Sequence, residues 1–180
     1  MDHIVLEKAA RLFYRTVICE VIEPALTEMA EEQLTQVQLA CMRFVHLHPE
    51  PSVGDIADGL AISDAASAKL IDRLVKKGIL TREEDPADRR VLKIKLTAPG
   101  IKLLETVNRI EHNQFEKIIN GMPAESVKAL QEGLTAFLTA ALGSPEAIDN
   151  VCLKCGWEHI EDCPGNLRYT QLTGQQRKKY

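Results

Sequence analysis

The sequence predicts a mostly helical protein with a small β-hairpin, a winged helix-turn-helix flanked by long N- and C-terminal helices. Three observations support this fold class. Apolar residues recur at helical spacing through most of residues 3–142. Two short helical segments are joined by a tight turn, and a basic segment with strand-like alternation follows them. The winged unit should occupy about 34–96, and the long helices about 4–31 and 98–142.

Capping signals place the helices of the first half. Pro24 should kink or break the helical pattern of residues 3–30, because proline lacks a backbone donor. Thr35 and Gln38 have the spacing of a capping box and predict a helix that ends before Pro49. Ser52 then caps a short helix over 53–60. Ser63 caps the next helix, which runs to 77 and ends at a glycine.

The second half opens with the predicted hairpin. Residues 79–82 and 92–96 are strand-like, and a charged, proline-containing turn joins them. Thr97 caps a long helix over about 98–120, and Pro123 begins another over about 124–142. Gly143 and the two residues after it end a helical body, residues 1–143. Residues 144–180 form a tail with little periodicity.

Charge is distributed unevenly along a chain whose formal net charge is −4. Residues 1–62 hold four basic and ten acidic side chains, whereas residues 69–95 hold nine basic and five acidic ones. A basic patch in an acidic protein suits contact with phosphate and limits binding elsewhere. Aromatic residues make up 4% of the chain, too few for a surface that stacks single-stranded bases.

The helix over 63–77 is the predicted DNA-reading helix. Its first two turns carry small side chains, which permits close approach to a major groove. The hairpin tip would contact the backbone or the adjacent minor groove, where arginine is favoured. The expected contacts to double-stranded DNA are Ser63, Ala65, Ser67, Lys69, Arg73, Lys76, Arg89 and Arg90.

The tail contains the pattern Cys152-x2-Cys155-x3-His159-x3-Cys163. Three thiolates and an imidazole are ligands that zinc prefers, and metal binding would order a segment that has no core of its own. An iron–sulfur cluster held by the three cysteines and a fourth ligand is an alternative. A redox thiol switch is a third interpretation. Cys19 and Cys41 lie in apolar helical stretches and are predicted to be buried.

The body resembles the MarR family of bacterial transcription regulators over roughly residues 4–143. The resemblance is carried by Gly54-Asp-Ile-Ala-Asp58, Lys69-Leu-Ile-Asp-Arg-Leu-Val-Lys-Lys-Gly-Ile-Leu80, Asp85-Pro-Ala-Asp-Arg-Arg90 and Leu96-Thr-Ala-Pro-Gly100. It implies a homodimer that reads a palindromic operator. It also implies control by a small molecule, an oxidant or a metal, with a pocket where the dimer helices meet the winged domain. The tail lies outside this resemblance.

Other classes of protein fit the sequence less well. No nucleophile–base pair or phosphate-binding loop is recognisable, so we expect no enzyme. No apolar run is long enough to cross a membrane, and the start of the chain does not have the form of an export signal, so a cytoplasmic protein is expected. A winged-helix module that binds a protein partner instead of DNA is the alternative from another class.

Overall fold

The computed structural model describes residues 3–29, 32–84 and 92–177. Its first helical arm consists of α1 (His3–Val17), the π-helical turn η1 (Ile18–Ile22) and α2 (Glu23–Glu28). The predicted disruption occurs where expected, because Pro24 lies in the first turn of α2 directly after the π turn. Proline offers no N–H to the preceding turn, and a π turn is one way to accommodate that loss. Cys19 is exposed on this arm, so its predicted burial is wrong for the single chain.

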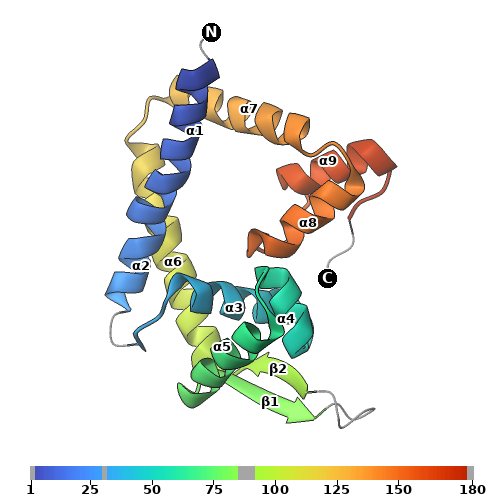
Figure 1. The fold of residues 1–180 in the computed structure, drawn as a ribbon. Coiled ribbons are helices and arrows are strands. Elements are labelled where there is room, and N and C mark those ends of the chain that lie inside the picture. Colours follow the sequence, from blue (N-terminus) through green and yellow to red (C-terminus); the bar gives the residue numbers. More distant parts are fainter. Residues whose placement is uncertain (1–2, 30–31, 85–91, 178–180) are drawn as a thin grey trace.

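The winged helix-turn-helix follows α2 (Figure 1). It contains α3 (Gln36–Leu47), α4 (Val53–Leu60) and α5 (Asp64–Lys76), and then the strands β1 (Leu80–Glu84) and β2 (Leu92–Leu96). The capping box of Thr35 and Gln38 forms as predicted, and Ser52 forms a second capping box with Asp55. The strands pair antiparallel, with Leu80 opposite Leu96. The predicted fold class is therefore confirmed.

Two long helices complete the body. They are α6 (Ala98–Asn120), capped by the Thr97 hydroxyl as predicted, and α7 (Ala124–Ala141). The lower part of the arm, η1 and α2, packs against α6, while Figure 1 shows α7 leading away from the arm toward the tail. Among the described residues, no helix is both long enough and apolar enough to span a membrane.

The tail is more regular than its sequence suggested. It folds into α8 (Pro145–Cys155) and α9 (Pro164–Thr173), which pack against each other. Ser144 caps α8 through its hydroxyl, and Gly156 ends it with a positive φ of 73°. Periodicity was weak because few side chains of the tail are buried; Ile148 is fully buried, whereas five large apolar residues remain exposed.

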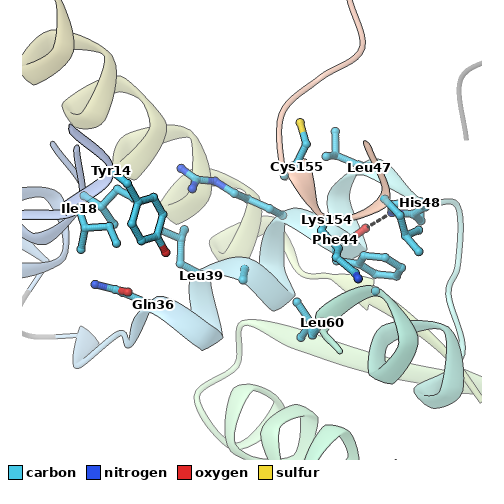
Figure 2. Close-up of a pocket in the computed structure, with 16 residues that line it drawn as sticks. Tyr14, Ile18, Gln36, Leu39, Phe44, Leu47, His48, Leu60, Lys154 and Cys155 are labelled. Carbon is cyan, nitrogen blue, oxygen red and sulfur yellow. Dashed lines mark hydrogen bonds between the residues drawn. The ribbon is translucent and has the colours of Figure 1, made fainter. Parts of the chain in front are cut away.

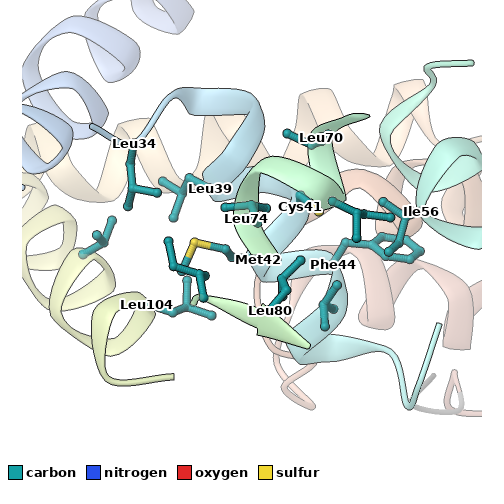
Figure 3. Packing of buried hydrophobic residues seen from close by; sticks show 14 of the residues in the cluster. Leu34, Leu39, Cys41, Met42, Phe44, Ile56, Leu70, Leu74, Leu80 and Leu104 are labelled. Carbon is teal, nitrogen blue, oxygen red and sulfur yellow. The ribbon is translucent and has the colours of Figure 1, made fainter. Parts of the chain in front are cut away.

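The hydrophobic core belongs to the winged domain and α6 (Figure 3). Cys41 and Met42 of α3 lie at its centre, and burial raises the pKa of the Cys41 thiol to about 12. Such a thiol stays protonated and unreactive, which confirms the core role predicted for it. The other fully buried large side chains of this core are Leu39, Ile56, Ile71, Leu74, Leu80, Ile94, Leu104 and Val107.

Candidate DNA-reading surface and cysteine-lined cavity

The turn between α4 and α5 sets the direction of the reading helix. Ala61 ends α4 in the left-handed region with φ 53°, and the Ser63 hydroxyl then caps α5 by accepting from the backbone N–H of Ala66 at 3.3 Å. The Ser67 hydroxyl donates to the carbonyl of Val53 at 2.9 Å. This bond fastens the start of α5 to the start of α4.

Most of the predicted DNA-contacting residues of α5 lie on one open face. Ser63, Ala65, Lys69, Arg73 and Lys76 are all exposed. The three cations make no ion pair with any described residue, so their charge is available to phosphate.

Ser67 is the exception among the predicted contacts. It is fully buried, and its hydroxyl is used by the Val53 carbonyl. The small side chain is needed because α4 and α5 approach closely at this position, not because DNA does. The prediction that Ser67 contacts DNA is therefore wrong.

The wing is braced against the reading helix. Arg82 of β1 pairs with Asp72 of α5 at 2.6 Å between Nη2 and Oδ1. Lys95 of β2 pairs with Glu83 at 2.7 Å and with Glu50 at 2.9 Å, and these two carboxylates raise its pKa. Lys95 therefore supports the wing rather than offering free charge. The tip residues Arg89 and Arg90 lie outside the described residues.

A cavity of about 410 Å³ opens between the helical arm and the winged domain (Figure 2). Tyr14 and Ile18 line it from the arm, and Leu39 and Phe44 line it from α3. The end of α8 forms a further wall through residues 153–156. The family resemblance implied a pocket where the dimer helices meet the winged domain, and this remains a prediction; the cavity observed here lies between the N-terminal arm and the winged domain and has an additional wall from the tail.

Arg43 of α3 connects this region to α6 and to the tail. Its Nη2 donates to Asn108 Oδ1 at 2.8 Å and to Glu111 Oε2 at 2.5 Å. Its guanidinium carbon lies 5.0 Å from the centre of the Trp157 ring, in a cation–π contact. Glu111 is 2% exposed, so the ion pair with Arg43 is almost fully removed from solvent. The sequence pattern did not indicate Arg43, because none of these partners is near it in the chain.

The tail cysteines meet around a second cavity of about 260 Å³. Cys152, Cys155, Cys163 and His159 all line it, as do His46 and His48 from the end of α3. The four residues predicted as metal ligands are thus brought to one place. Among the described residues, however, no three His, Cys, Asp or Glu side chains stand in a metal-ligating arrangement.

Gly165 keeps two of these thiols close to the start of α9. A methyl group at Gly165 would lie 3.2 Å from Cys152 Sγ and 3.8 Å from Cys163 Sγ. Burial raises the pKa of the Cys152 thiol; the cation of Arg177 opposes this shift, while charge on Cys155 and Cys163 adds to it. Cys155 and Cys163 are therefore both near enough to Cys152 to influence its thiol electrostatically.

The histidines at the end of α3 have structural partners. His48 Nδ1 lies 2.9 Å from the carbonyl oxygen of Phe44, and the His48 ring stacks on Phe44 with 4.0 Å between centroids. Both contacts fix the His48 ring at the end of α3. His46 Nε2 lies 3.7 Å from Glu158 Oε1 of the tail, a contact that becomes an ion pair when the histidine is protonated.

The folded elements and the exposed cationic helix define a winged helix-turn-helix protein. Residues 34–92 match the model of the MarR family. Among solved structures, RV1404 from Mycobacterium tuberculosis is 22% identical with a TM-score of 0.67; the match covers 78% of this chain and 94% of that one.

Two further structures show the same fold. FabT from Streptococcus pneumoniae, solved in complex with DNA, is 21% identical with a TM-score of 0.61, covering 75% of this chain and 93% of FabT. Wild-type MarR from E. coli, in its apo form, is 20% identical with a TM-score of 0.60, covering 74% of this chain and 96% of MarR. The chain therefore has a MarR-type winged-helix fold.

Proposed function

We propose that this protein is a transcription regulator of the MarR type that binds double-stranded DNA in a sequence-specific manner and is not an enzyme. The cations Lys69, Arg73 and Lys76, on the helix after the tight turn, carry this proposal: they are exposed and make no ion pair within the described part of the chain. Relatives solved with DNA use the same fold, which supports DNA as the partner. Lys69 would lie nearest the bases, and Arg73 and Lys76 would contact phosphates.

The direct test is selection of duplexes from a random pool, followed by fluorescence anisotropy at several salt concentrations. We expect a palindromic preference, and an Arg73→Ala variant that binds all duplexes more weakly and lowers the salt slope by about 1, as loss of a phosphate contact should. Lys128→Ala is the matched control, because Lys128 is an exposed lysine on α7, outside the winged domain. Failure to select any sequence, with no salt-sensitive DNA affinity, would favour the protein-interaction module instead.

We propose a homodimer as the DNA-binding unit. α1 contains no buried residue, and it exposes Leu12 and Tyr14. The end of α6 exposes Phe115 and Ile118, and α7 exposes Phe137. Apolar area of this extent on long helices needs a partner, and a two-fold dimer matches two half-sites of a palindrome. Sedimentation equilibrium of the wild type and of Phe137→Glu measures this: the wild type should be dimeric, and the variant should dissociate at higher concentrations.

A small-molecule effector would bind in the larger cavity. Its walls come from the arm that supports the dimer and from the winged domain, so a bound molecule could change the angle between them. The aromatic and aliphatic lining suits an organic ligand with an apolar body.

We further propose that the tail holds a metal ion through Cys152, Cys155, His159 and Cys163, with zinc as the preferred metal. The convergence of these four side chains on one cavity supports it. An iron–sulfur cluster on the same thiols is the alternative. A thiol switch is less favoured, because burial raises the pKa of Cys152 and a reactive thiol needs a low pKa.

Elemental analysis and visible absorption of protein purified without oxygen separate these possibilities. A colourless protein with one zinc per chain supports the zinc site, whereas a brown protein with iron and sulfide supports the cluster. Protein free of both metals that also fails to take up added zinc would leave the thiol switch.

A further inference from the structure

The tail contacts the winged domain through the turn that ends α8. Gly156, in the left-handed region, brings the backbone close to Arg43; a methyl group at Gly156 would lie 3.3 Å from Arg43 Cδ. The next residue, Trp157, places its ring against the Arg43 guanidinium at 5.0 Å. The turn that contacts Arg43 therefore begins directly after Cys155, one of the proposed metal ligands.

Arg43 is in turn fixed to α6. Its side chain is 11% exposed and donates to both Asn108 and Glu111. A buried guanidinium with these partners has little freedom to reorient, because leaving Glu111 unpaired in the interior is costly. A change in the position of the 155–157 turn therefore reaches both α3, which carries Arg43, and α6, which supports the winged domain.

The two cavities also share part of their walls. Leu47, His48 and Cys155 line both the cysteine cavity and the larger cavity. Cys155 therefore has three roles. It is a proposed metal ligand, it lines the larger cavity, and it directly precedes the turn that contacts Arg43. An ion bound to Cys155 restrains all three features together.

We propose that the Trp157–Arg43 contact is a latch through which the winged domain responds to metal in the tail. Metal binding to the cysteines holds the 155–157 turn on Arg43, and this fixes α3 relative to α6 in one arrangement. The inference rests on the proposed metal site and on the proposed DNA binding. It adds that metal and DNA are thermodynamically coupled ligands of one protein.

The experiment uses the whole 180-residue chain, zinc, and the duplex obtained by selection. DNA dissociation constants are measured by anisotropy for zinc-loaded and chelator-treated protein. We expect them to differ by about 5- to 150-fold in the wild type, the usual range of coupling between two sites. Because linkage is reciprocal, the duplex must change the zinc affinity by the same factor, measured by competition with a chromophoric chelator.

Trp157→Ala should abolish this coupling while zinc still binds. Trp157 is 53% exposed and is not a proposed ligand, so its removal should leave the fold and the thiols intact. Ile160→Ala is the matched control, since Ile160 is an apolar residue of the same loop with a similar exposed fraction of 60%. Trp157→Phe keeps an aromatic face for Arg43 and should retain part of the coupling. Trp157 is also the only tryptophan of the chain, so its emission should change when zinc binds.

Each other result has a defined meaning. Zinc that binds without changing DNA affinity overturns the latch and leaves a purely structural metal. Full coupling in Trp157→Ala, or a zinc effect without reciprocity, also overturns it. Absence of thiolate-to-Co²⁺ absorption after cobalt addition overturns the metal site itself, and absence of DNA binding overturns the proposed function.

Discussion

The winged domain and the tail are held together by different means. In the winged domain, α3, α5, the hairpin and α6 share a continuous core in which many side chains are fully buried. In the tail, Ile148 is buried among helices that expose most of their other apolar residues. These are Val151, Trp157, Ile160, Leu167 and Leu172.

The tail has few buried apolar side chains, and polar contacts hold its helices together. Arg177 pairs with Asp149 at 2.6 Å, and its backbone N–H donates to the buried amide of Asn166. Arg168 Nε donates to the carbonyl of Leu142 at the end of α7. A segment with so small a core gains stability from a metal more readily than a domain that is already well packed. The contrast supports the proposal that a metal ion orders the tail.

The largest expected effect tests this contrast directly. Leu74→Ala removes a fully buried side chain from the main core and should lower the free energy of unfolding by roughly 2–5 kcal/mol. Ile148→Ala should instead leave the main urea transition in place and increase hydrogen exchange through α8 and α9. Equal loss of the main transition in both variants would mean that body and tail unfold as one unit.

A smaller effect is expected where backbone segments approach closely in the body. The Cβ of an alanine at position 100 would lie 2.2 Å from the carbonyl oxygen of Ile79, so Gly100→Ala should destabilise by about 1–3 kcal/mol. Gly54→Ala is the control, because its Cβ would meet only Ser52 Oγ at 3.8 Å. In a helix this change should stabilise by roughly 0.5–1 kcal/mol. Urea midpoints of both variants measure the difference, and a tolerated Gly100→Ala would contradict the close approach.

In the tail, the corresponding close approach involves sulfur atoms. Gly165→Ala places a methyl group beside Cys152 Sγ and Cys163 Sγ without removing a ligand. Zinc affinity should fall by roughly 10-fold, as for other changes next to a metal site. Gly143→Ala, between α7 and α8, is the control, since no atom lies within 4 Å of its added Cβ and its φ is not positive. Unchanged zinc affinity in Gly165→Ala would place the metal away from these two sulfurs.

The smallest expected effect concerns the cap of α4. Asp55 accepts from the backbone N–H and the hydroxyl of Ser52, and these bonds lower its pKa. A carboxylate with a depressed pKa stabilises the fold above its unfolded pKa, and the contribution disappears as pH falls through the folded value. Asp55→Ala should therefore cost less than about 1 kcal/mol near neutral pH, where solvent screens it.

The pH dependence is measured by urea unfolding from neutral pH downward. The gap between wild type and Asp55→Ala should close as the solution becomes acidic. Asp58→Ala removes the same charge from the same helix without touching the cap, and it should show no such gap. A gap that persists in acid would assign the effect to packing instead of to the carboxylate.

Local rules explain which elements could be predicted from the sequence. The Thr35, Ser52, Ser63 and Thr97 caps act on backbone groups within three residues, so the starts of their helices were predicted correctly. The wing was also predicted by a local rule, because residues 92–96 alternate between apolar and charged side chains as a strand does. The spacing of the cysteines predicted that they would meet, because Cys152 and Cys155 are a helical turn apart and Cys163 follows after a short loop.

Contacts between distant segments were decided by tertiary packing alone. The small side chain of Ser67, in the first two turns of the predicted reading helix, suggested a DNA contact. In the folded chain α4 packs over Ser67 and buries it. The tail sequence shows little periodicity because its helices have few buried positions. The partners of Arg43 are Asn108, Glu111 and Trp157, which lie 65 or more residues away, and no local pattern records such pairs. The sequence by itself determined the helices of the body, the wing and the spacing of the tail cysteines. The contacts that the end of α8 and the turn after it make with the winged domain decided that these cysteines border it, because those contacts join residues far apart in the chain.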